Sequence, residues 1–186
     1  MKLVKLLSFS ITFWMCRKEK NMAKKTAYLG MLTALAFVFS YIEFLLPINV
    51  GIQGIKLGLA NLIVIVTLYT IGFKEACVLS VVRIILTGFT FGNLFSMLYS
   101  LAGGALSLLV MVIGKNVKLF SVVGVSVLGG VFHNIGQILV AILVVENGSL
   151  LYYLPVLIVS GTIAGVMIGI LAAILIKRLK HTIRKC

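Results

Sequence analysis

The feature of this sequence that most limits its possible folds is a series of apolar runs, several of them close to 20 residues long. About 20 predominantly apolar residues are enough for one helix to cross the hydrocarbon core of a bilayer. Hydrophobic residues make up 61% of the chain and charged residues 11%, which leaves too little polar surface for a soluble domain. Backbone in lipid is satisfied only in helices or closed barrels, and continuous runs of this length favour helices. We therefore predict an all-α integral membrane protein.

Six transmembrane helices are predicted over residues 27–46, 57–73, 76–91, 94–113, 120–145 and 150–176. Pro47 closes the first run because proline cannot continue a helix, and polar or glycine-containing turns separate the others. Residues 22–180 are expected to form one membrane domain, with a basic tail over 177–186. The first 21 residues combine basic residues with an apolar stretch too short to span. They are either an interfacial amphipathic lead-in or an extension upstream of a true start at Met22.

The distribution of basic residues predicts the orientation. With the N-terminus inside, the cytoplasmic segments hold 15 Lys and Arg residues, whereas the outer loops hold Lys56 alone. Basic residues collect on the cytoplasmic side, where they meet anionic lipid, so both termini are expected there, in a multi-pass protein of the cell membrane, most simply a bacterial plasma membrane. The net charge of +13 is thereby explained without nucleic acid, which would require a basic face on a soluble domain.

Composition also argues against catalysis and metal binding. The chain contains no Asp, and its four acidic residues are isolated Glu residues. An Asp-rich magnesium–diphosphate site therefore cannot be built, and no Ser/His/acid set or phosphate-binding loop is present. The three cysteines show no metal-binding or disulfide spacing, and a single intramembrane His supplies too few ligands for a metal. We expect neither enzymatic activity nor a cofactor.

Ionisable residues within predicted spans are candidates for function because their burial in lipid is costly. Arg83 lies near the middle of the third span, and Glu43 lies one turn before Pro47 in the first. Two interpretations remain open. The two side chains form a structural ion pair, or Arg83 binds an anionic ligand.

A second polar group lies in the fifth span, where His133 and Gln137 share a helix face and Asn134 flanks it. Asn61 and Asn93 are placed toward the outer side by the same topology. Together with Glu43 and Arg83, these residues predict a ligand pocket that opens outward. Ordinary hydrogen bonding within the core is the alternative for His133.

Small residues recur every fourth position in two spans. Thr26, Gly30 and Ala34 lie on one face of the first span, and the sixth span carries Gly161, Gly165 and Gly169. Such rows let helices approach closely. They serve packing within the bundle, docking of another membrane protein on the first span, or a homodimer through the sixth.

Four ordered motifs then point to a family. They are GIKLGLANLIVI (54–65), RIILTGFTFGN (83–93), SLAGGALSLLVM (100–111) and GGVFHNIGQILVA (129–141). Over about residues 22–180 the chain resembles the family labelled heptaprenyl diphosphate synthase component I, also called the Gx transporter family. That family is similar in size and layout to the S components of energy-coupling-factor transporters. Those six-helix proteins bind a micronutrient and dock through the first helix onto a coupling membrane subunit with ATPases.

The resemblance implies an S-component-like bundle in which Thr26, Gly30 and Ala34 form the docking face, although that face usually reads Ala-xxx-Ala. The predicted function is a membrane substrate-binding component for uptake of a small polar or anionic, vitamin-like molecule, energised by separate ATPases. The alternative is a non-catalytic membrane subunit associated with a prenyl diphosphate synthase in isoprenoid or quinone synthesis. Arg83, His133, Asn134, Gln137, Glu43, Asn61 and Asn93 are the predicted ligand-binding residues.

Overall fold

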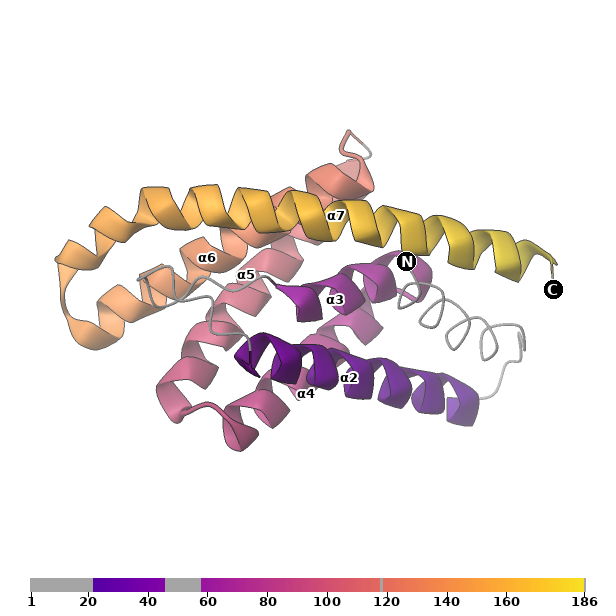
Figure 1. Cartoon of the computed structure of the whole chain (residues 1–186), viewed down its shortest axis with the longest axis horizontal. Coiled ribbons are helices and arrows are strands. Elements are labelled where there is room, and N and C mark those ends of the chain that lie inside the picture. Colours follow the sequence, from indigo (N-terminus) through magenta and orange to yellow (C-terminus); the bar gives the residue numbers. More distant parts are fainter. Residues whose placement is uncertain (1–21, 46–57, 118, 186) are drawn as a thin grey trace.

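A computed structural model describes residues 22–45, 58–117 and 119–185, and every regular element in these ranges is a helix (Figure 1). The elements are α2 (Met22–Leu45), α3 (Leu59–Thr70), α4 (Phe73–Thr90), α5 (Leu94–Val117), α6 (Val122–Val145), the 3-10 helix η1 (Gly148–Tyr153) and α7 (Leu154–Lys185). The predicted lead-in over residues 1–21 and the connection that contains Lys56 lie outside the described residues. In Figure 1 the first residues of α2 and the last residues of α7 lie at the same end of the bundle.

Each predicted span overlaps at least one helix, but the helices differ in their ability to cross a membrane. The stretches Lys25–Leu45, Leu94–Val117, Val122–Val145 and Gly148–Leu179 are long and apolar enough to span. The α3 helix has 12 residues and is a shorter apolar helix, and α4 has 18 residues, among them Lys74, Glu75 and Arg83. The protein is a multi-pass membrane protein, and full spanning by α3 and α4 remains a prediction.

The α3 helix forms the centre of the core. Its residues from Leu62 to Leu68 are all buried, and it contacts α2, α4 and α7. A helix that is apolar on every side belongs in the interior of a bundle, which accounts for its pattern. At its C-terminal end Lys115 of α5 donates to the Leu68 carbonyl at 2.7 Å and lies over the Tyr69 ring. Lys115 thus satisfies a carbonyl that the helix end leaves open.

Glycines determine how α6 packs between α5 and α7. A Cβ added at Gly130 would lie 2.5 Å from the Gly161 carbonyl oxygen, and one at Gly165 would lie 2.7 Å from the Val127 Cα. A Cβ at Gly169 would lie 2.8 Å from the Val123 Cα. The sixth-span glycine row therefore faces α6 of the same chain, where it is buried. Packing within the bundle accounts for it, and it is not exposed for a homodimer.

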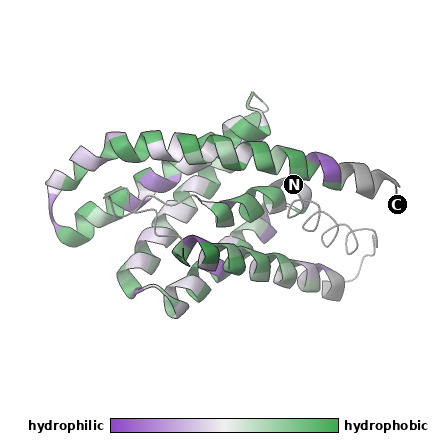
Figure 2. Ribbon diagram, viewed as in Figure 1, coloured by the Kyte–Doolittle hydropathy of each residue, from purple (hydrophilic) through white to green (hydrophobic). Residues whose placement is uncertain are grey.

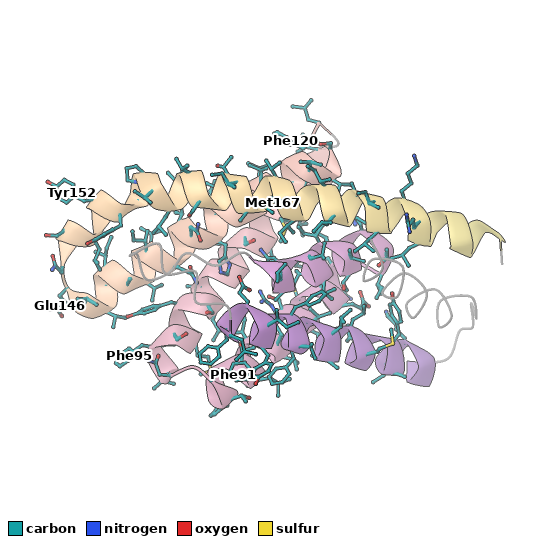
Figure 3. The ribbon with its side chains drawn as sticks, in the orientation of Figure 1. Phe91, Phe95, Phe120, Glu146, Tyr152 and Met167 are labelled. Carbon is teal, nitrogen blue, oxygen red and sulfur yellow. The ribbon has the colours of Figure 1, made fainter. Side chains whose placement is uncertain are left out.

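The outer surface is apolar. Most of each helix is hydrophobic, and hydrophilic residues are confined to short stretches (Figure 2). Large apolar side chains such as Phe89 and Leu143 are exposed, and Met167 points outward from α7 (Figure 3). Glu146 and Tyr152 lie at the two ends of the turn that joins α6 to α7 (Figure 3). An apolar outside of this kind suits contact with lipid tails.

Candidate ligand pocket

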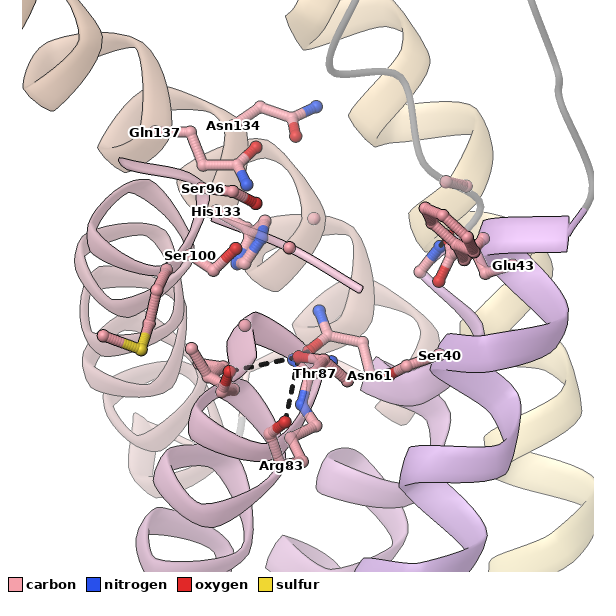
Figure 4. A pocket seen from close by; sticks show the side chains of 18 of the residues that line it. Ser40, Glu43, Asn61, Arg83, Thr87, Ser96, Ser100, His133, Asn134 and Gln137 are labelled. Atoms are coloured by element: carbon pink, nitrogen blue, oxygen red, sulfur yellow. Dashed lines mark hydrogen bonds between the residues drawn. The ribbon is translucent and has the colours of Figure 1, made fainter. Parts of the chain in front are cut away.

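A cavity of about 610 Å³ lies between α2, α3 and α4 on one side and α5, α6 and α7 on the other (Figure 4). All seven residues predicted to bind ligand line it: Glu43, Asn61, Arg83, Asn93, His133, Asn134 and Gln137. The volume is within the range of small-molecule sites. Residues predicted from the cost of burying polar groups in lipid thus share one cavity, although they come from five segments of the chain.

Arg83 is the cationic group on the α4 side of the pocket. Its Nη2 donates to the Asn61 Oδ1 over a long distance of 3.5 Å (Figure 4), and its buried Nε has no hydrogen-bond partner among the described residues. A guanidinium carries five N–H donors, so most of its bonding capacity is not used by these partners. Buried polar groups are generally hydrogen-bonded, which marks Arg83 as the group most in need of an acceptor.

The carboxylate of Glu43 has a backbone partner at the start of α3. Its Oε1 accepts from the backbone N–H of Gly58 at 2.5 Å, and its carboxylate also acts on Arg83 electrostatically. Gly58 caps α3 with φ of 72°, a conformation that glycine adopts most readily. The carboxylate therefore lies at the positive N-terminal end of α3, where an anion is favoured. Glu43 thus has a backbone partner in addition to its electrostatic effect on Arg83, and both interpretations of the two side chains stay open.

The α6 side of the pocket is polar without a fixed charge. His133, Asn134 and Gln137 project from one stretch of α6, with Ser96 and Ser100 of α5 nearby (Figure 4). The Nδ2 of Asn134 donates to the Leu157 carbonyl at 2.7 Å, so this amide also ties α6 to α7. A Cβ at Gly103 would lie 2.6 Å from the His133 carbonyl oxygen. Glycine at that position is what lets α5 approach the polar stretch.

Asn93 lines the pocket and also caps the start of α5. Its Oδ1 accepts from the Ser96 backbone N–H at 2.7 Å, which makes it the N-cap of α5. The remaining polar lining residues were not predicted from the sequence: Ser40, Thr87, Ser96, Ser100 and Ser126. Serine and threonine often bond to their own helix backbone, as Ser40 and Thr87 do. The spacing of Ser96 and Ser100 on one α5 face was the available signal.

An aromatic cluster closes the pocket toward α2. The Phe91 ring centroid lies 5.3 Å from that of Phe37, 5.5 Å from that of Tyr41 and 5.4 Å from that of Phe44. Phe44 and Phe91 also line the cavity. Ring pairs at these separations attract beyond simple burial, so Phe91 fastens the α4–α5 turn to α2.

The predicted docking face lies elsewhere on α2. Thr26, Gly30 and Ala34 are exposed, and a Cβ at Gly30 would meet no atom of the described residues within 4 Å. Packing within the bundle therefore does not account for this row, in contrast to the row on α7.

Among residues 22–45, 58–117 and 119–185, no three His, Cys, Asp or Glu side chains lie close enough together to hold a metal ion. A family model described as heptaprenyl diphosphate synthase component I matches residues 32–175. No curated protein and no solved structure matches the chain.

Proposed function

This chain belongs to the heptaprenyl diphosphate synthase component I family, and we propose that it serves as the substrate-binding component of a membrane uptake system. Its ligand would be a small polar or anionic molecule, bound in the cavity between the two halves of the bundle. The observation that carries the proposal is the guanidinium of Arg83, whose buried Nε has no acceptor among the described residues of an apolar bundle. A ligand anion would supply that acceptor.

The roles of the other lining residues follow from their chemistry. His133 and Gln137 would orient the ligand by hydrogen bonds, as would the Oδ1 of Asn134 and the amide of Asn61. Asn93 would contribute less, because its Oδ1 caps α5. No group of three His, Cys, Asp or Glu side chains that could hold a metal ion occurs among the described residues, which supports binding rather than metal-dependent catalysis.

Energy for uptake would come from a coupling membrane subunit with ATPases. The exposed row of Thr26, Gly30 and Ala34 supports a docking surface, because small residues permit close helix approach in a membrane and nothing in the described bundle covers Gly30. The resemblance to S components of energy-coupling-factor transporters favours the same face.

A second candidate function is suggested by the family description itself. A component I of heptaprenyl diphosphate synthase would be a membrane subunit that accompanies a soluble prenyl diphosphate synthase without doing the chemistry. The absence of Asp from the sequence supports an accessory role, since a magnesium–diphosphate site needs several carboxylates.

Mass spectrometry of proteins that co-purify with the C-terminally tagged chain, gently extracted from its native membrane, tests both candidates. We expect a coupling membrane subunit with ATPases, lost in Gly30→Leu and retained in Gly148→Leu. Gly148 is the matched control because a Cβ added there would also meet no atom of the described residues within 4 Å. Recovery of a soluble prenyl diphosphate synthase in place of ATPases would overturn the uptake proposal and establish the second candidate.

A further inference from the structure

We propose that the pocket selects a ligand with one carboxylate group and an uncharged hydrogen-bonding body, and that it discriminates against phosphates and diphosphates. This inference rests on the proposed function, in that the cavity must bind a small molecule. It concerns the chemical class of that molecule. Three features of the lining carry it.

The first feature is a single cationic group, the planar guanidinium of Arg83. Arg83 is the one Lys or Arg among the described lining residues, and its Nε is buried without a partner there. The planar guanidinium matches the two oxygens of a carboxylate in a bidentate pair. Its present acceptor, the Asn61 Oδ1, is 3.5 Å away, so a carboxylate would replace a weak contact with two strong ones.

The second feature is that Glu43 already occupies the other natural anion site. Phosphates bind at helix N-termini because backbone N–H groups and the helix dipole converge there. The N-terminus of α3 lines this cavity at Gly58 and Asn61, but the Glu43 carboxylate accepts the Gly58 N–H at 2.5 Å. A phosphate would therefore compete with Glu43 for the Gly58 N–H and would be repelled by its negative charge.

The formal charge of the lining also favours a ligand with one carboxylate over a phosphate or diphosphate. The described lining contributes one Arg and one Glu, so its formal charge is zero apart from His133. A monocarboxylate adds one negative charge beside Arg83. A diphosphate adds two or three in a low-dielectric site, where uncompensated charge is costly, and no carboxylate cluster for a bridging cation occurs among the described residues.

The third feature is the wall opposite Arg83. It consists of amide, imidazole and hydroxyl groups, represented by Gln137, His133 and Ser100, and farther along of small residues from α6 and α7 such as Gly130 and Ala164. Neutral groups of this kind hydrogen-bond to hydroxyl, amide or ring-nitrogen atoms. The smooth glycine and alanine surface accommodates a flat or apolar part of the same ligand.

The test uses the full-length chain in lipid nanodiscs, equilibrated with the small-molecule extract of cells that express it naturally. After washing, retained compounds are identified by mass spectrometry for the wild type, for Arg83→Gln and for Arg178→Gln, a control at an exposed position on α7. We expect one compound class with a single carboxylate and no phosphorus. Its retention should fall at least about tenfold in Arg83→Gln, as expected for a lost charged hydrogen bond, and persist in Arg178→Gln.

The outcomes separate this inference from the proposed function. Retention of phosphorylated compounds that depends on Arg83 would overturn the carboxylate assignment and leave a substrate-binding protein. Retention of no compound that depends on Arg83 would overturn both. Thermal unfolding of each variant shows whether a loss reflects the pocket or the fold.

A gain-of-function variant tests the discrimination directly. Glu43→Gln keeps an oxygen that can accept the Gly58 N–H but removes the negative charge, so inorganic pyrophosphate should bind at least about tenfold more tightly to this variant than to the wild type. Equal pyrophosphate affinity in the two proteins would overturn the role given to Glu43.

Discussion

The two halves of the bundle are held together in different ways. In the α2–α3–α4 half, branched side chains interlock around α3, where Ile63 and Ile65 are each 1% exposed. In the α5–α6–α7 half, glycines bring backbones into direct contact, as at Gly130 and Gly161. Side chains can repack around a change in shape, whereas backbone contacts cannot.

The two halves also divide the chemistry of the pocket. Both charged lining residues, Glu43 and Arg83, belong to the half packed by side chains, while the glycine-packed half contributes neutral groups such as His133 and Gln137. The neutral wall of the pocket, formed by α5, α6 and α7, is therefore expected to be more rigid than the charged wall formed by α2, α3 and α4. A ligand held by Arg83 would therefore act mainly on α4 and its neighbours α2 and α3, and α2 also carries the exposed small-residue face.

The largest effect is expected from a cavity in the side-chain-packed half. Ile65→Ala removes a buried side chain and should lower the free energy of unfolding by about 2–5 kcal/mol. Ile170→Ala is the matched control, because Ile170 is 49% exposed on α7 and its loss should change stability by only about 0.5 kcal/mol. Unfolding in detergent micelles titrated with a denaturing detergent measures both. Equal losses would mean that α3 is not the centre of the core.

An intermediate effect is expected from crowding the glycine-packed half. The new methyl group of Gly165→Ala would lie 2.7 Å from the Val127 Cα, so we expect a loss of about 1–3 kcal/mol. The new methyl group of Gly30→Ala would meet no atom of the described residues within 4 Å. This variant should therefore stabilise its helix by about 0.5–1 kcal/mol, because glycine is a poor helix former. The same unfolding assay measures the two opposite signs. A neutral Gly165→Ala would contradict the direct backbone contact.

The sequence predicted the members of the pocket better than their bonds. Arg83, His133 and Gln137 could be found because a polar group in an apolar span needs a compensating environment. Glu43 was placed correctly in the lining, but its partner is a backbone N–H 15 positions away. Backbone partners of this kind depend on how α2 meets the start of α3, and no residue type signals them.

For helix packing, too, the sequence indicated that a close contact forms but not which helix makes it. The spacing of Gly161, Gly165 and Gly169 indicated close approach by some helix, and the structure gives α6 of the same chain. The equivalent row on α2 has the same spacing and yet is exposed at Gly30. Spacing alone does not distinguish an internal contact from an external one, because both need the same small side chains.

The smallest effect is expected at the end of the bundle opposite the pocket, where Lys25 of α2 forms an ion pair with Glu75 at the start of α4. The hydrogen bond from Lys25 is the main cause that holds the pKa of the Glu75 carboxyl below its ordinary value of 4.5. Because Lys25 is 56% exposed, Lys25→Ala should cost only about 0.2–1 kcal/mol at pH 7. Lys74→Ala is the comparison variant, because Lys74 is exposed and its charge is the smallest of the causes that lower the pKa of Glu75, so its loss should cost less than that of Lys25.

The pH dependence gives this pair a distinct signature. A lowered carboxyl pKa in the folded state means that the stabilisation is complete above the ordinary pKa and is lost as the pH falls through the lowered one. The difference between the wild type and Lys25→Ala should therefore shrink as the pH is taken below 4.5, and it should also shrink in high salt. Unfolding titrations of both proteins at several pH values measure it. A difference that is independent of pH and salt would mean that the aliphatic stem of Lys25, and not its charge, joins α2 to α4.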